Sequence, residues 1–434
     1  MTVQTDAAPA SPGTADVASL PSTPCPFCGI LCDDLELSRT AGRLKIVRNG
    51  CARAVAGFER SVTGTSPSVG GKPVSLDEAV AAAITILRGA KLPLYGGLGT
   101  DVDGMRAVMS LADKSRGVVD HALSEGQFRN FKVLQTSGWF LTTLTECRNR
   151  ADLFVIVASD VHALHPRFFE RIVTPAMSMF ADPAPKRDVV FLGQGLDQSG
   201  ATGPRMGNVA SLDCPNDRTG EIIAALRAIV NGTPLKTETV AGIPMADIRA
   251  LADRIRAASY PVFVWAPPSL AFPSADLLVH AICELVKDLN KTQRAAGLSL
   301  GGNEGAVSAG AVCAWQSGYP LRVSYASGKP EYDPLRYAIR TMLEAGEGDC
   351  LVWLSTFTPD LAPPPSKVPL ILIGTPGTPS PATPAVFIPV GTPGADHAGR
   401  IVRCDNVVSL PLRDLGRSKL PRAADILSAI EAAL

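Results

Sequence analysis

Short apolar runs alternate with longer amphipathic stretches along most of the chain. Continuous apolar runs predict strands that are covered on both faces of a sheet, and they are Leu153–Ala158, Val189–Leu192, Val262–Trp265, Leu351–Leu354 and Leu370–Ile373. Apolar residues at helical spacing predict helices over Thr219–Val230, Met245–Ala258, Ala275–Leu289, Tyr337–Glu344 and Ala423–Ala433. Buried strands that alternate with helices are typical of a parallel sheet. The pattern therefore predicts an α/β fold with Rossmann-like parallel-sheet domains.

The same alternation begins earlier, at a helix-capping signal. Ser75 and Glu78 have the spacing of a capping box, which predicts a helix over Ala79–Leu87. A short predicted strand at Leu92–Tyr95 and a glycine-rich turn follow this helix. The turn lacks the dinucleotide-binding fingerprint, because Val102 occupies the position of the third glycine. We therefore expect a tight turn between a strand and a helix.

Four of the ten cysteines lie within 27 residues near the N-terminus. Cys25, Cys28 and Cys32 are separated by two and three residues, and Cys51 follows after 18 more. Apolar and polar residues largely alternate over residues 35–47, on either side of a Thr-Ala-Gly turn. This pattern predicts a β-hairpin, which returns the chain to its starting end and brings Cys51 beside the other three.

Four converging thiolates suit a tetrahedral metal centre, either a [4Fe–4S] cluster or a structural zinc ion. Metal-free burial is the alternative, because cysteine also packs as a small hydrophobic residue. Disulfides are not expected, since nothing in the sequence indicates an oxidising compartment. We expect a small N-terminal β module around this cysteine cluster.

Composition excludes several classes of function. Lysine plus arginine and aspartate plus glutamate both total 41, so the chain has no overall basic charge for nucleic acid. No segment approaches the ~18–20 consecutive apolar residues that a membrane span needs. The first 23 residues lack the basic and apolar parts of a signal peptide and predict a disordered tail. We expect a cytoplasmic protein that binds neither nucleic acid nor membrane.

These patterns divide the chain into three parts. They are a tail over residues 1–23, the cysteine-cluster β module over 24–70, and α/β Rossmann-like domains over 71–434. The internal boundary of the last part is left open. A proline-rich connection at 359–393 contains 11 prolines in 35 positions. This density excludes helix, and excludes a central strand outside Leu370–Ile373.

The cysteine motif resembles a known family. The run from Cys25 to Asp34 reads Cys-Pro-Phe-Cys-Gly-Ile-Leu-Cys-Asp-Asp and is similar to that of the B subunit of formylmethanofuran dehydrogenase, a member of the molybdopterin oxidoreductase superfamily. Further matches are Ala151-Asp152, His165-Pro166-Arg167 and the segment Trp315–Pro320, so the resemblance spans residues from roughly 24 to 412. It implies a molybdopterin-oxidoreductase-like fold and a [4Fe–4S] cluster on the four clustered cysteines.

The chain departs from this family at one position of importance. In the dehydrogenase, a cysteine or selenocysteine binds molybdenum or tungsten after the strand that ends here at Asp120. Residues from Asp120 to Phe128 contain no thiol, and none lies between Cys51 and Cys147. Serine or glycine cannot replace a soft thiolate without changing the metal site. We therefore expect no molybdenum or tungsten pterin here, although the family brings its pterin dinucleotide close to the region of Gly301–Gly305.

The chain is more similar in this respect to the B subunit of the bacterial formyltransferase/hydrolase complex of methylotrophs. The resemblance implies a complex that moves a formyl group from tetrahydromethanopterin to a methanofuran-type coenzyme and hydrolyses it to formate. It places the active sites on formyltransferase and amidohydrolase-like sister subunits, alongside a further structural subunit. This chain is then a non-catalytic, redox-silenced structural subunit. The alternative is the B subunit of an active molybdenum or tungsten formylmethanofuran dehydrogenase, an oxidoreductase.

Basic side chains gather near the predicted hairpin. They are Arg39, Arg43, Lys45, Arg48 and Arg53. A solvated charged face is the ordinary interpretation of such a group. The alternative is a binding site for the acidic tail of the furan coenzyme, because arginine binds carboxylates with two parallel hydrogen bonds.

Overall fold

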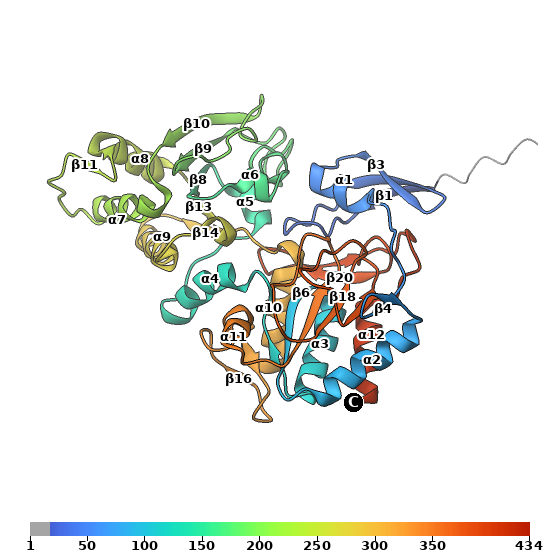
Figure 1. Cartoon of the computed structure of the whole chain (residues 1–434). Coiled ribbons are helices and arrows are strands. Elements are labelled where there is room, and N and C mark those ends of the chain that lie inside the picture. The colour runs from blue at the N-terminus through green and yellow to red at the C-terminus, as the bar shows by residue number, and fades with distance from the viewer. Residues whose placement is uncertain (1–17) are drawn as a thin grey trace, which may run out of the picture.

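The computed structural model describes residues 18–434, and residues 1–17 of the expected tail lie outside this range. The described chain forms a small N-terminal β module and two large sheets with their helices (Figure 1). The last six residues of the expected tail form strand β1 (Ala18–Thr23). They do so because their backbone pairs antiparallel with strand β2 (Leu35–Thr40). Residues 18–23 therefore belong to the module and not to a tail.

The predicted hairpin of the module is confirmed. Strand β2 pairs antiparallel with β3 (Arg43–Arg48), and both Ala41 and Gly42 in the turn between them have positive φ. Helix α1 (Ala52–Phe58) begins directly after Cys51. The alternation in β2 directs Leu35 and Leu37 into a core that also contains side chains of the second large sheet. The module is therefore held by tertiary packing, since a hairpin alone is marginal in water.

The larger sheet has nine strands in the order β16-β15-β7-β6-β17-β18-β19-β4-β5. Their bounds are β4 (Ser68–Val69), β5 (Lys72–Pro73), β6 (Pro93–Gly99), β7 (Val118–Val119), β15 (Val323–Ser324), β16 (Glu331–Tyr332), β17 (Cys350–Ser355), β18 (Leu370–Gly374) and β19 (Val386–Pro389). The five central strands are parallel, and the edge strands pair antiparallel. Because β4 already belongs to this sheet, the N-terminal module ends before residue 68.

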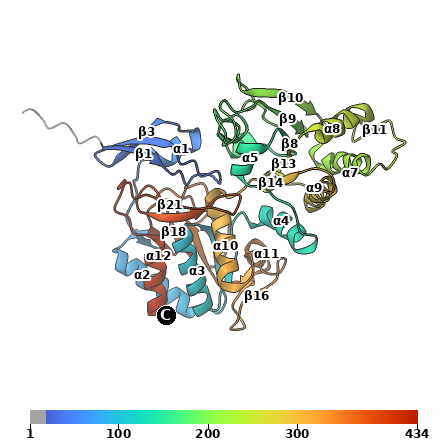
Figure 2. The ribbon, with the colours of Figure 1, turned by 180° about the vertical axis from the view of Figure 1, so that it is seen from behind.

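Helices cover both faces of this sheet. One face carries four helices, which are α2 (Leu76–Gly89), α3 (Val102–Lys114), α10 (Ala306–Ser317) and α12 (Ala423–Ala433). Figure 2 shows α12, α3 and α10 in front of the strands. Helix α11 (Ile339–Ala345) covers the other face. Successive side chains of a strand point to opposite faces, so β17 contributes to the core on each side. Val352 and Leu354 pack on the face that carries the four helices, and Leu351 and Trp353 pack on the face that α11 covers.

The second large sheet is parallel throughout, in the order β10-β9-β8-β13-β14. Its strands are β8 (Leu153–Val157), β9 (Arg187–Leu192), β10 (Met206–Leu212), β13 (Pro261–Trp265) and β14 (Ala296–Ser299). They come from one continuous stretch, which lies between strands β7 and β15 of the larger sheet. The predicted α/β fold class is therefore confirmed, with the second sheet inserted into the sequence of the first.

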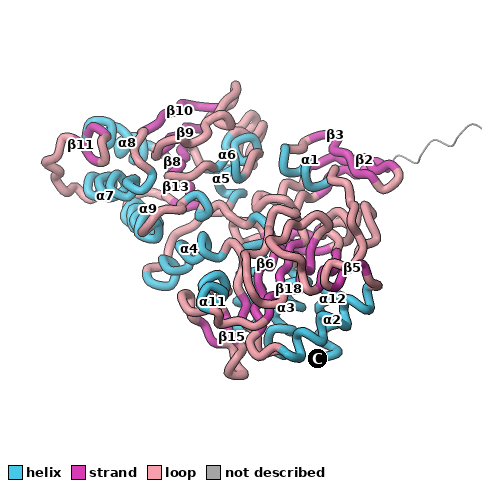
Figure 3. Tube along the Cα trace, in the orientation of Figure 1, coloured by secondary structure: helices cyan, strands magenta, loops and turns pink. Residues whose placement is uncertain are grey.

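The helices of the second sheet lie on two sides. Helices α7 (Thr219–Val230), α8 (Met245–Ala257) and α9 (Ala275–Leu289) share one core with it. The other face packs against α5 (Leu144–Arg150), α6 (Val161–Leu164) and a short π-helical turn (Phe169–Val173), and against the N-terminal module. Figure 3 shows the helices around the strands of both sheets. The module therefore completes a core that the second sheet begins.

The remaining elements of the described chain are α4, two small hairpins and three short 3₁₀ helices (Asn216–Arg218, Pro267–Ser269 and Asn303–Gly305). Helix α4 (Ser124–Thr136) follows β7, β11 (Thr239–Val240) pairs with β12 (Ile243–Pro244), and β20 (Gly399–Val402) pairs with β21 (Ser409–Leu412).

The prediction for the proline-rich connection was wrong in one respect, because β19 is a parallel strand inside the larger sheet. Its apolar residues Val386–Ile388 precede Pro389, which is the last residue of the strand, and the backbone N–H of the following Val390 donates to the carbonyl of Gly374 at 3.0 Å. No helix within residues 18–434 is long and apolar enough to span a membrane.

Candidate functional site

The three N-terminal cysteines lie on a loop that closes on itself. The backbone N–H of Cys25 donates to the carbonyl of Cys32 at 2.8 Å. The backbone N–H of Leu31 donates to the carbonyl of Cys28 at 3.2 Å. Cys51 is the residue before helix α1, and the β2–β3 hairpin carries it back to the loop. All four cysteines line one cavity of about 10 Å³. The spacing and the hairpin therefore place all four cysteines at the wall of one cavity.

Burial raises the pKa of the buried thiols of this loop. Burial raises the pKa of Cys28 to about 11, although the charge of Arg53 lowers it. Burial and the charge of Cys28 raise the pKa of Cys32 to about 12, against lowering contributions from Arg171 and Arg167. Four thiols are the donor type and number that zinc or an iron–sulfur cluster takes. Within residues 18–434, however, no three His, Cys, Asp or Glu side chains stand at metal-ligating distances in this structure.

Arg167 joins the cysteine loop to the second sheet. Its guanidinium donates to both carboxylate oxygens of Asp34 at 2.8 Å, to Glu170 at 2.6 and 2.9 Å, and to the carbonyl of Asn49 at 2.6 Å. Burial raises the pKa of Asp34, but the hydrogen bonds from Arg167 and the charge of Arg171 outweigh burial and bring it below its usual range. Arg167 is 6% exposed. It therefore neutralises the acidic end of the cysteine motif inside the protein.

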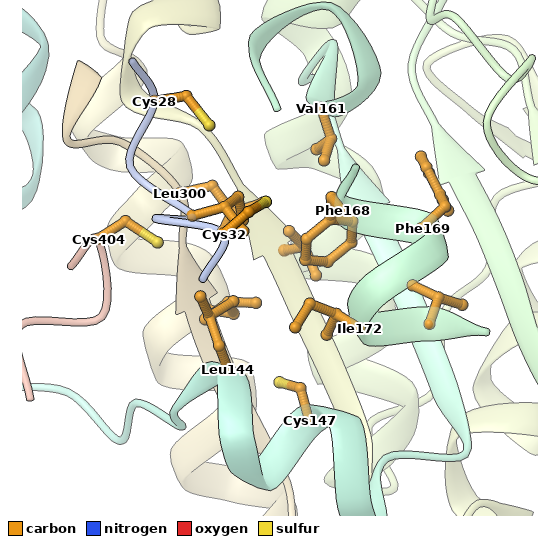
Figure 4. Close-up of a cluster of buried hydrophobic side chains, with 14 of the residues drawn as sticks. Cys28, Cys32, Leu144, Cys147, Val161, Phe168, Phe169, Ile172, Leu300 and Cys404 are labelled. Carbon is orange, nitrogen blue, oxygen red and sulfur yellow. The ribbon is translucent and has the colours of Figure 1, made fainter. Parts of the chain in front are cut away.

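A fifth cysteine lies beside the cluster. The backbone N–H of Cys404 donates to the carbonyl of Gly29 at 2.9 Å. A Cβ atom at Gly29 would lie 1.8 Å from the carbonyl oxygen of Gly301, so only glycine permits this approach. Figure 4 shows Cys404 with Cys28 and Cys32 around Leu300. Three loops that are distant in sequence thus meet at the cysteine cluster.

The five basic residues near the hairpin do not form one site. Arg43, Lys45 and Arg48 are exposed on β3, where Arg48 also lies 3.7 Å from Glu36. Arg39 instead donates to the carbonyl of Leu415 at 2.9 Å. Arg53 lies on α1 and lines both the cysteine cavity and a larger cavity. Three exposed charges on one strand are therefore what the structure offers to an acidic ligand.

The larger, central cavity has a volume of about 720 Å³. Helices α4 and α10 line it, together with the loop after β14 and residues 404–406. The carboxyl ends of parallel strands are where α/β proteins commonly bind ligands. Leu123 and Gln127, from the thiol-free segment between Asp120 and Phe128, are on its wall. Among the described residues that line this cavity, the cysteine is Cys404, which lies far in sequence from the segment of Leu123 and Gln127.

Glu304 is the unusual charged residue of this cavity. It is 9% exposed and has a positive φ of 52° between Gly302 and Gly305. Its Oε1 accepts a hydrogen bond from Thr358 at 3.0 Å, whereas its Oε2 has no partner. Burial raises the pKa of Glu304 to about 7, and nearby Asp360 adds to the rise. The carboxyl group therefore changes its charge near neutral pH.

Most of the chain is similar to one group of known proteins, although no family model matches it. The chain is 26% identical over 403 residues to the B subunit of the tungsten-containing formylmethanofuran dehydrogenase 2 of Methanococcus maripaludis, over 88% of this chain and 91% of that protein. It is 28% identical over 337 residues to the B subunit of the formyltransferase/hydrolase complex of Methylorubrum extorquens, over 77% and 87%. The chain is a homologue of the formylmethanofuran dehydrogenase B subunit.

A solved structure also matches the chain. The chain superimposes with a TM-score of 0.70 and 25% identity on a chain in the crystal structure of the formyltransferase/hydrolase complex from Methylorubrum extorquens in complex with methylofuran. The match covers 85% of this chain and 98% of that one. The predicted resemblance and the fold class are therefore confirmed.

Sequence reasoning about this B-subunit homologue missed three residues of the site. Cys404 is isolated in the sequence, and only its packing against Gly29 reveals it. Glu304 lies in the glycine-rich run Gly301–Gly305, which the resemblance singles out as a region near a pterin dinucleotide and not for its acidic residue. Arg167 was noted as part of a motif, but its pairing with Asp34 depends on a contact across 133 residues. In each case the signal was a tertiary contact.

Replacing Glu304 with glutamine is expected to stabilise the protein more at high pH than at low pH. The pKa of this glutamate rises from 4.5 in the unfolded chain to about 7 when folded. The folded state therefore holds the proton more tightly, and its free energy of unfolding falls as the pH rises from 4.5 through 7. Between about pH 5 and about pH 8, the free energy of unfolding of the wild type is expected to fall by ~2 kcal/mol because of this group. Glutamine does not titrate, so the variant lacks this fall. Urea unfolding of both proteins at the two pH values measures it.

The matched control for this prediction is Glu347→Gln, which changes the same charge at an exposed position after α11. Its stability difference from the wild type is expected to be the same at both pH values. A Glu304→Gln variant whose difference is also independent of pH would contradict the buried, proton-binding carboxyl group.

Proposed function

We propose that this chain is a non-catalytic structural subunit of a formyltransferase/hydrolase complex. In this proposal the complex converts formyl-tetrahydromethanopterin to formate through a methanofuran-type coenzyme. Its active sites are on sister formyltransferase and amidohydrolase-like subunits, alongside a further structural subunit. The observation that carries the proposal is the segment from Asp120 to Phe128, which contributes to the central cavity but contains no thiol. The match to a chain of such a complex, over 98% of that chain, supports it.

We also propose that Cys25, Cys28, Cys32 and Cys51 hold a metal centre, either a [4Fe–4S] cluster or zinc. Cys25, Cys28 and Cys32 are buried, Cys51 is half-buried, and the position of all four around one small cavity supports this assignment. When bound, such a centre supplies cross-linking of the loop to α1, and a cluster additionally supplies a one-electron redox couple. Metal analysis and visible absorbance of anaerobically purified protein separate iron from zinc.

The acidic tail of the coenzyme is proposed to bind at the basic residues near the hairpin. Of the five, Arg43, Lys45 and Arg48 are exposed on β3, where Arg48 also lies 3.7 Å from Glu36. Arg39 and Arg53 are only partly exposed, so they contribute less. Replacing the three exposed residues with serine is expected to raise the KM for the coenzyme without changing the turnover number.

The purified complex is expected to release formate from formyl-tetrahydromethanopterin without a molybdenum or tungsten centre on this chain. The reason is the missing soft ligand, without which the metal site changes its character. Elemental analysis of the complex and viologen dye reduction by the formylated coenzyme test the expectation. Formate release with neither stoichiometric metal nor dye reduction supports the structural role.

The second candidate is an active molybdenum or tungsten formylmethanofuran dehydrogenase subunit. One observation favours it, because Cys404 places a thiol on the wall of the central cavity. Stoichiometric molybdenum or tungsten on this chain, together with dye reduction, would establish this candidate and overturn the structural role.

A further inference from the structure

The second sheet has one covered edge and one open edge. At the β14 edge, Gly297 donates to the carbonyl of Phe140 and accepts from the N–H of Thr142, both at 2.9 Å, so the chain before α5 covers this strand. At the opposite edge, β10 pairs with β9, and no other strand within residues 18–434 pairs with it. Figure 1 shows β10 as the outermost strand of this sheet. Its outer side is therefore available to a strand of another molecule.

Alternate residues of β10 direct their backbone groups outward. The carbonyl of Leu212 accepts from the N–H of Gly193, the residue after β9, so Leu212 and Ala210 face β9. In a parallel ladder the residues in between face the other way. The N–H and C=O groups of Val209 and Ser211 therefore point away from the sheet, and both residues are exposed.

The open edge lacks charged residues and proline, which commonly protect edge strands from pairing. The seven residues of β10 include neither, and the apolar side chain of Val209 is 40% exposed. The strand stays extended throughout, with a register shift against β9 between Met206 and Val209. An uncharged edge strand of this length favours β-augmentation, in which another strand is added to the sheet.

The charges at the two ends of β10 are complementary to each other. Arg205 precedes the strand, Asp213 follows it, and both residues are exposed. The Nε–H of Arg205 donates to the carbonyl of Thr174 at 3.0 Å, which leaves its two terminal NH₂ groups for a further partner. An antiparallel copy of the strand, centred on Val209, places each Arg205 opposite an Asp213. Opposite charges across a strand pair stabilise it, whereas like charges destabilise it.

We propose that the open edge of β10 binds the β10 strand of a second copy of this chain, antiparallel and centred on Val209. The outward backbone groups of Val209 then form a hydrogen-bonded pair on the two-fold axis. Two five-stranded sheets become one continuous sheet, and each copy contributes the same surface, as in other two-fold interfaces. The contact joins two copies of the complex and is independent of the role in formyl transfer.

Cross-linking of Val209→Cys in the intact complex tests the contact. The Cα atoms of a hydrogen-bonded antiparallel pair lie about 5.5 Å apart, a separation that suits a disulfide. Oxidised glutathione is expected to link two copies of this chain into a covalent dimer, which denaturing electrophoresis without reductant detects. The wild type and Leu277→Cys, an exposed position on α9, are expected to give no dimer. No dimer with Val209→Cys, as when a sister subunit covers the edge, would overturn the proposal.

Charge reversal in the Val209→Cys protein tests the register. Either Arg205→Asp or Asp213→Arg alone puts like charges opposite each other at both ends of the strand pair, and is expected to lower the amount of dimer about 10-fold. The double variant restores opposite charges and is expected to restore the dimer. Misfolding does not give this pattern, because both positions are exposed and the double change rescues each single one. Unchanged dimer in both single variants, or no recovery in the double variant, would overturn the proposal.

Discussion

Cys28→Ser is expected to prevent docking of the N-terminal module and assembly of the complex, while each complex that does assemble keeps its normal rate of formate release. Cys28 is buried among the four thiols, on the loop that packs against Gly301 and Cys404. The module is small, and a thiolate-bound structural metal supplies up to ~10–16 kcal/mol of folding free energy. Serine is a poor ligand for such a soft metal centre.

The measurement is the yield of assembled complex together with formate release per assembled complex. Cys283→Ser is the matched control, because Cys283 is equally buried but lies on α9 in the core of the second sheet. Its effect is expected to be confined to a modest loss of stability. Normal assembly of Cys28→Ser with abolished turnover would show that the cysteine site takes part in catalysis, and the structural role would be wrong.

Arg167→Met is expected to lower the free energy of unfolding by about 3 kcal/mol. The variant leaves Asp34 and the carbonyl of Asn49 without the guanidinium that binds them. The estimate lies at the lower end for buried ion pairs, because the side chain of Asp34 is 36% exposed and is partly hydrated. Urea unfolding monitored by limited proteolysis of the module measures the loss.

The matched control is Arg218→Met. Arg218 also forms an ion pair with a glutamate three residues later, but both side chains are about half exposed. Such exposed pairs contribute less than ~1 kcal/mol. An Arg167→Met variant that is no less stable than Arg218→Met would mean that the buried pair does not hold the module.

Local patterns predicted the parts of this fold that depend on local physics. The alternation at Leu35 and Leu37 predicted the hairpin, because one face of the strand must be buried. The capping box at Ser75 is present, with Ser75 and Glu78 bound to each other's backbone. The cysteine spacing likewise predicted that Cys51 returns to the first three cysteines, and all four line one cavity.

Features that depend on distant contacts were not predictable in this way. The second sheet is inserted between β7 and β15, and no local pattern marks this insertion. Strand β19 was missed because its prolines suggested a loop, although its apolar residues complete a parallel ladder with β18. The central cavity is formed by helices and loops from separate parts of the chain, so no single segment reveals it.

Contacts between the two ends of the sequence also determine when the N-terminal module can finish packing during synthesis on the ribosome. Arg39 donates to the carbonyl of Leu415, 376 residues later, and Arg417 donates to the carbonyl of Gly57. At ~5–20 residues per second, the hairpin waits about 20–75 s for these late-synthesised partners. The nascent cysteine loop is therefore without its final packing for most of translation. The four cysteines are therefore accessible to other molecules for longest during that interval.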